Sequence, residues 1–128
     1  MAEFDFDDCR DKLQRATRIV LDAEAAFAKA VEASAETEAF YRVQLAERFL
    51  AHREAGAAVE AANTLARGEC AAHSLQRDKA AGMLKLAGEK LEDARDSRRS
   101  LWRLVEWARG RDLATAGAPE NVPGDRWP

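Results

Sequence analysis

The sequence is poor in residues that end helices or fill a wide core. Between Asp5 and Glu54 it contains neither glycine nor proline, so nothing there interrupts a helix. Aromatic residues make up only 7% of the chain, and much of the 47% hydrophobic fraction is alanine, which buries little surface per residue. These shortages exclude a broad globular core. The abundance of Ala, Glu, Leu and Arg predicts long helices that meet along a thin seam.

Long apolar runs and a large net charge are also missing. No apolar stretch approaches the roughly 20 residues of a membrane span, and the acidic start MAEFDFDD is not a secretory signal. We therefore expect a cytoplasmic protein without a membrane partner, in which Cys9 and Cys70 stay reduced. The net charge of −3 argues against coating of nucleic acid by the whole surface, although a local basic patch is compatible with it.

Catalytic signatures are absent as well. The chain has no Ser-His-Asp set, no glycine-rich phosphate loop and no distinctive carboxylate pair, so we predict a protein that is not an enzyme and uses no cofactor. Cys70 and His73 are three residues apart and share a helix face, but His52 is too distant to join them. Two ligands do not make a zinc site, and we predict no metal.

A heptad pattern fills the first part of the chain and predicts a helix over about residues 5–54, continuous or broken near Ser34. Large residues occupy one lane and small residues the other, which permits close approach of a neighbouring helix. The large lane is Phe6, Leu13, Val20, Phe27, Ser34 and Tyr41. The small lane is Cys9, Ala16, Ala23, Ala30 and Thr37.

A second helical pattern covers about residues 57–113, after a turn near Gly56, with an interruption expected at Gly68. Its seam is Val59, Ala66, His73, Ala80, Ala87, Ala94, Leu101 and Ala108, beside Cys70, Arg77, Leu84, Leu91, Arg98 and Val105. Residues 114–128 have no periodicity and form an irregular tail. The predicted fold is all-α: a long antiparallel helical hairpin, or coiled coil, over residues 1–113. So thin a seam favours a homodimer in which two hairpins form a four-helix bundle.

A tight turn at Gly56 fixes a register in which Phe27 lies near Leu84 and Tyr41 lies near Cys70 or Ala71. The same register brings acidic residues of the N-terminus beside arginines at the end of the second helix. Opposite charges then favour antiparallel pairing. The acids are Glu3, Asp5, Asp7, Asp8 and Asp11, and the arginines are Arg98, Arg99, Arg103, Arg109 and Arg111.

The segment RRSLWRLVEWARGR, residues 98–111, is the main candidate binding site, for a protein or for single-stranded DNA. Arginines interleaved with tryptophans offer charge for phosphates and ring faces for bases. The candidate residues are Arg98, Arg99, Trp102, Arg103, Trp107 and Arg109. The alternative is structural, with one tryptophan in the seam and the arginines paired with the N-terminal acids. An exposed second tryptophan would instead indicate a protein interface.

Two further candidates lie elsewhere. The tail segment VPGDRWP presents Arg126 and Trp127, which either dock on a partner or fold back on the helices. Phe40 lies one step from the heptad stripe, and we expect it to mark either a helix bend or a contact between two hairpins of a dimer.

The runs YRVQLAERFLAHREAG and RDKAAGMLKLAGEKLEDARDSRRSLWRLVEWAR resemble small bacteriophage proteins rich in Ala, Leu and Arg. The resemblance covers about residues 38–109 and rests on Tyr41, Arg42, Arg77 and Leu91. It implies a helical hairpin associated with phage DNA recombination or replication. The longer first helix and the proline-rich tail depart from that pattern.

The function we predict is that of a non-enzymatic interaction protein. The first hypothesis is a phage accessory factor acting on recombination or replication proteins, or on single-stranded DNA. One alternative is a phage inhibitor of a host defence or nuclease complex, and another is a structural or chaperone coiled coil of a virion or secretion assembly.

Overall fold

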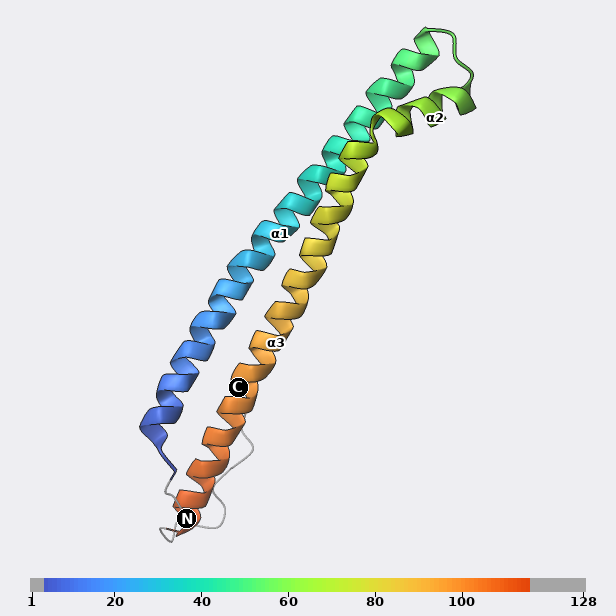
Figure 1. Cartoon of the computed structure of the whole chain (residues 1–128). Coiled ribbons are helices and arrows are strands. Elements are labelled where there is room, and N and C mark those ends of the chain that lie inside the picture. Colours follow the sequence, from blue (N-terminus) through green and yellow to red (C-terminus); the bar gives the residue numbers. More distant parts are fainter. Residues whose placement is uncertain (1–3, 116–128) are drawn as a thin grey trace. The chain divides into compact units, whose positions relative to one another are not determined.

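The structure is a computed structural model that describes residues 4–115, and it is built from three helices in that range (Figure 1). These are α1 (Phe6–Glu54), α2 (Val59–Glu69) and α3 (Ala71–Thr115). The predicted all-α class is confirmed. Within the described residues, no helix combines the length and the apolar character that crossing a membrane requires.

Acidic residues begin α1. The Asp5 carboxylate accepts a hydrogen bond of 3.0 Å from the backbone N–H of Asp8, and so satisfies one of the free donors of the first turn. Asp7 and Asp8 then lie near the positive end of the helix dipole. They also form ion pairs along the same helix, Asp7 with Arg10 at 3.3 Å and Asp8 with Lys12 at 2.9 Å.

α1 is unbroken past Ser34, which settles whether the helix is interrupted there. The Thr37 hydroxyl donates to the carbonyls of Ala33 and Ser34, at 2.9 and 3.1 Å, within the continuous helix. The helix ends at Glu54, and Gly56 follows with a φ of 97°, which is accessible to glycine at little cost. Its N–H donates to the carbonyl of Arg53 at 3.1 Å and so closes the last turn.

α2 is a separate short helix with one inward face. Ala62, Ala66 and Cys70 are spaced by four residues and are almost completely inaccessible to solvent. The chain leaves helical geometry at Cys70, two residues after Gly68, and α3 begins immediately afterwards. Val59 was predicted to lie in the seam, and that prediction is wrong because its side chain is 51% exposed. It occupies the first turn of α2, where the buried face has not yet formed.

The described contacts divide the chain into two units. Unit 1 comprises Met1–Ala23 and Leu91–Pro128, and unit 2 comprises Glu24–Lys90. The core of unit 1 is a seam of small residues around Val20, whose side chain is only 1% exposed. The other buried members are Cys9, Ala16, Leu91, Ala94 and Ala108.

The core of unit 2 is thinner still. Its fully buried residues are those of α2 and the following junction, and no side chain is buried in residues 24–54 of α1 or 71–90 of α3. The large seam residues there are only half-buried: Phe27, Tyr41, Leu45, Phe49 and Leu84. These two helix segments therefore protect little apolar surface from water.

At two contacts within unit 2 the register is displaced from the predicted one by about one helical turn or more, whereas Phe40 meets His73 close to the predicted level. Phe27 lies against Gly88, one turn beyond Leu84, at 3.5 Å from the position a Cβ would take there. Tyr41 lies under Arg77, not beside Cys70 or Ala71. Both pairs show that the segments are antiparallel. The shift arises because α2 and its two connections use more residues to turn the corner than a tight turn at Gly56 would.

A carboxylate of α2 ties this corner to α1. Glu69 hydrogen-bonds His52 Nε2 and accepts from Arg48 at 2.9 Å. The hydrogen bond from His52, followed by that from Arg48, lowers the pKa of Glu69 below its ordinary value.

We expect acid to loosen this corner. Because the pKa of Glu69 is lower in the folded state, its contribution is complete above the unfolded pKa, and is lost as the pH falls through the folded one. NMR titration of the Glu69 side chain should give a midpoint below that of an unstructured peptide. Glu69→Gln should remove this part of the acid sensitivity, and an unshifted midpoint would contradict the contact.

Candidate binding groove

A groove of about 600 Å³ lies in unit 1 between α1 and α3. α1 contributes Leu13 and Thr17, which follow each other at one helical turn. α3 contributes four arginines and a tryptophan, because a repeat of three and four residues places them on one side of that helix. These residues are Arg95, Arg98, Arg99, Trp102 and Arg103.

Three of the N-terminal acids do not pair with the groove arginines, which for these acids corrects the predicted pairing across the helices. In the described part of the chain, Asp7 and Asp8 pair with cations of α1, and Asp5 caps that helix. The prediction failed because acids in a first turn find their partners on their own helix, at i,i+3 and i,i+4. For Arg98, Arg99 and Arg103, the acids that the structure describes at the start of α1 therefore give the structural alternative no support.

The groove arginines differ in their partners. Arg99 pairs with Asp96 at 3.0 Å on the same helix. Arg98 is half-buried and Arg103 is exposed, and within residues 4–111 neither has an ion-pair or hydrogen-bond partner. Two guanidinium groups beside the half-buried Trp102 ring give the groove positive charge next to an aromatic surface.

Trp107 belongs to a different part of the surface, and Arg109 lies two turns beyond Trp102 on the same side of α3 without lining the groove. Trp107 is five residues beyond Trp102, which rotates it well away from the groove. Its side chain is 59% exposed, next to the exposed Leu104, and Arg111 lies over its ring at 5.4 Å from the centroid. Arg109 pairs with Glu106 at 3.6 Å on α3. Of the six residues predicted as one site, the structure brings four together in the groove and separates these two.

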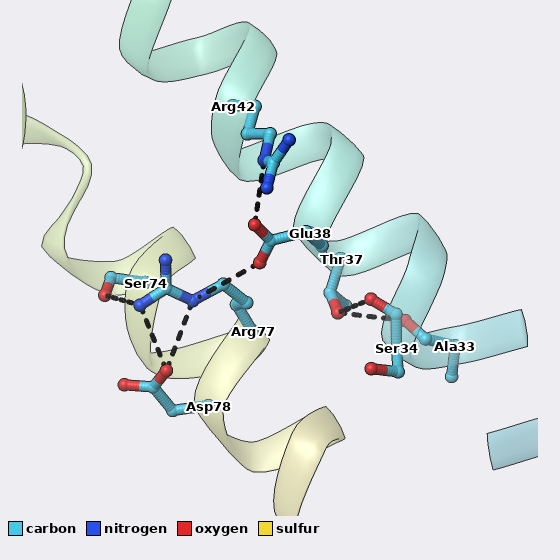
Figure 2. A network of polar contacts seen from close by, with 8 residues as sticks. All are labelled: Ala33, Ser34, Thr37, Glu38, Arg42, Ser74, Arg77 and Asp78. Carbon is cyan, nitrogen blue, oxygen red and sulfur yellow. Dashed lines mark hydrogen bonds and ion pairs between the residues drawn. The ribbon is translucent and has the colours of Figure 1, made fainter. Parts of the chain in front are cut away.

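Unit 2 carries a polar network on one face (Figure 2). Glu38 of α1 pairs with Arg42 at 2.8 Å and with Arg77 of α3 at 3.6 Å. Arg77 also binds Asp78 and lies over the Tyr41 ring, 4.4 Å from its centroid. Arg77 thus joins the two helices through charge and ring contact.

Phe40 and His73 form a second feature in unit 2. Their rings meet edge to face, with centroids 4.8 Å apart and an interplanar angle of 89°. They line a hollow of about 420 Å³ together with Glu36, Thr37 and Gln76. α1 continues through Phe40, so this residue does not mark a helix break.

The described residues contain no cluster of three potential metal ligands, since no three of their His, Cys, Asp or Glu side chains gather closely enough to hold a metal ion. Cys70 is a buried free thiol, as is Cys9. The tail candidates Arg126 and Trp127 lie outside the described residues.

The groove also contains residues that the sequence did not indicate. Leu13 was predicted as a seam residue, Thr17 was not singled out, and Arg95 lies outside the interleaved Arg/Trp segment. The arginine spacing Arg95, Arg98, Arg99 was the available signal, because it matches the 3.6-residue period of one helix face.

No known protein family, characterised protein or solved structure is recognisably similar to the chain. Inferences about function therefore rest on the geometry of its own residues.

Proposed function

We propose that this chain is a non-enzymatic accessory protein that binds single-stranded DNA in the groove of unit 1. The observation that supports this most is the pair Arg98 and Arg103, which lack an acidic partner within residues 4–111 and flank Trp102. Single-stranded nucleic acid offers both complements, phosphates for the guanidinium groups and base faces for the indole ring. A duplex keeps its bases stacked and offers only the phosphates.

Binding of a fluorescently labelled oligothymidylate, followed by anisotropy, tests the proposal. We expect micromolar affinity at low salt and weaker binding as salt rises. Each phosphate neutralised contributes about −0.7 to the slope of log K against log salt for a single strand. A duplex of equal length should bind more weakly. Unchanged anisotropy at high micromolar protein and low salt would overturn the proposal.

A protein partner is the second candidate, and a separate observation favours it. Trp107 is 59% exposed and adjoins the exposed Leu104 on α3, away from the groove. Exposed tryptophan is enriched among the residues that dominate protein interfaces. Such a contact would serve a recombination or replication partner, or equally the host nuclease or defence complex of the inhibitor hypothesis. The phage origin rests on sequence resemblance and stays a prediction, as does action in the host cytoplasm.

We also propose that two copies associate. The α1 and α3 segments of unit 2 bury no side chain between them, while the structure leaves Phe40, Val43, Leu50, Leu75, Met83 and Leu86 exposed. A pair of helices in this state protects too little apolar surface to offset the entropy of ordering it. Association of two hairpins would supply the missing layer.

A further inference from the structure

The hollow around Phe40 belongs to a larger face of unit 2. It joins Glu36 and Phe40 of α1 to His73 and Gln76 of α3. Met83 follows Gln76 by seven residues, two helical turns, so it lies on the same side of α3. Phe40 is 52% exposed and Met83 is 62% exposed. We call this surface the Phe40/Met83 face.

The two sides of unit 2 differ in character. Glu38 and Arg42 are each two residues from Phe40 along α1. Two residues turn an α-helix by about 200°, so both side chains lie nearly opposite Phe40. They belong to the ion network with Arg77 that occupies their own side (Figure 2). The Phe40/Met83 face has no such ion network in the described residues, and it exposes the large apolar side chains of Phe40 and Met83.

The Phe40/Met83 face also carries one acid and one base at the same level. Glu36 precedes Phe40 by one turn of α1, and Lys79 follows Gln76 by three residues of α3. Because α1 and α3 are antiparallel in unit 2, the step from Phe40 back to Glu36 and the step from Gln76 on to Lys79 run in the same direction along the helices. Glu36 and Lys79 therefore stand at a similar height on the two helices, and neither has an ion-pair partner within residues 4–111.

We propose that the Phe40/Met83 face is the homodimer interface, with the two-fold axis running along the helices. This inference rests on the proposed dimer and specifies its geometry. With that axis, α1 of each copy packs on α3 of the other at the same level. Phe40 and Met83 are covered, and each Glu36 meets Lys79 of the second copy. Two such ion pairs form, because the interface is symmetric.

The competing arrangement places the two-fold axis across the helices. It packs α1 on α1 and α3 on α3, so Glu36 of one copy has no Lys79 of the other within reach. Charge complementarity therefore distinguishes the two geometries, and it selects the first.

Sedimentation equilibrium of the full chain, with charge reversals, tests this assignment. Glu36→Lys and Lys79→Glu should each raise the dimer dissociation constant by about tenfold, because two pairs become repulsive in each dimer. The double variant should restore the wild-type value within about threefold. Phe40→Ala should also weaken the dimer by about tenfold or more. Lys85→Glu is the matched control, since Lys85 is exposed on the other side of α3.

Each outcome of the sedimentation experiment has one interpretation. Restoration by the double variant supports the assigned face and its axis. Weakening by Phe40→Ala without any effect of the charge reversals supports the face and overturns the axis. A dimer insensitive to every variant overturns the face but leaves the proposed dimer standing. A chain that is monomeric at high micromolar concentration overturns the dimer itself, and DNA binding in the groove of unit 1 is unaffected by that result.

Discussion

Val20→Asp is expected to destabilise unit 1 strongly. The Val20 side chain is 1% exposed and is the largest fully buried apolar side chain of that unit. Its neighbours in the seam are alanines, a cysteine and Leu91, none of which can donate a strong hydrogen bond to a carboxylate. An unpaired buried carboxylate costs several kcal/mol, so we expect a loss of about 3–5 kcal/mol in the free energy of unfolding. Domains of this size hold only about 5–15 kcal/mol in total.

Ile19→Asp provides the matched control. Ile19 precedes Val20 on the same helix, and the substitution likewise replaces a β-branched apolar side chain with aspartate. The Ile19 side chain is 58% exposed. Its free energy of unfolding should change by less than about 1 kcal/mol. Urea titration followed by tryptophan fluorescence reports on the unfolding of unit 1, because all three tryptophans belong to its segment Leu91–Pro128. Equal losses for the two variants would contradict the assignment of Val20 as the centre of the seam.

The helices could be predicted because their signals are local. The absence of glycine and proline before Gly56, the acids at Asp5 to Asp8, and the heptad lanes all act within one or two turns. The same lanes identified Val20 and Ala16 as seam positions, and the structure buries both. A pattern of this kind is set by the period of one helix and needs no knowledge of its neighbour.

The relation between helices was harder to predict. The register depends on how many residues turn the corner, and α2 with its connections displaced it by about a turn relative to a hairpin closed at Gly56. The predicted pairing of N-terminal acids with the arginines of α3 failed for the same kind of reason. Charge composition says that partners exist, but it does not say whether Asp8 prefers Lys12 on its own helix or an arginine on the next.

The candidate site was predicted in its residue types and not in its boundaries. The Arg/Trp segment was visible in sequence, but two tryptophans five residues apart cannot face the same way on one helix. The structure accordingly puts Trp102 in the groove and Trp107 on another surface. The contribution of Leu13 and Thr17 depends on packing between residues far apart in the chain, which a single sequence does not encode in any local pattern.

Trp102→Ala is expected to weaken binding of single-stranded DNA by about 5- to 150-fold. The ring is half-buried at the groove and is the aromatic surface among its lining residues. Stacking of one base on an aromatic ring is worth about 1–3 kcal/mol, which corresponds to that range. Trp102→Phe keeps a ring face in the same place and should retain most of the affinity. If phenylalanine fails to rescue binding while helix content is unchanged, stacking is not the contribution of this residue.

The contribution of the arginines should appear in the salt dependence of DNA binding. Arg98→Ala/Arg103→Ala removes two guanidinium groups that have no ion-pair partner within residues 4–111, so we expect about tenfold weaker binding and a salt slope shallower by about 1.4. Arg10→Ala/Arg42→Ala changes the net charge equally, but each of these arginines already pairs with an acid of its own helix. That control should leave the slope unchanged. Equal slopes for both double variants would mean that the chain attracts DNA through its total charge and not through the groove. Suppose that Trp102→Ala weakens binding and that only the Arg98/Arg103 double variant changes the salt slope. One DNA strand then contacts the tryptophan and the two arginines together, because the indole ring stacks on a base and the guanidinium groups bind the phosphates beside it.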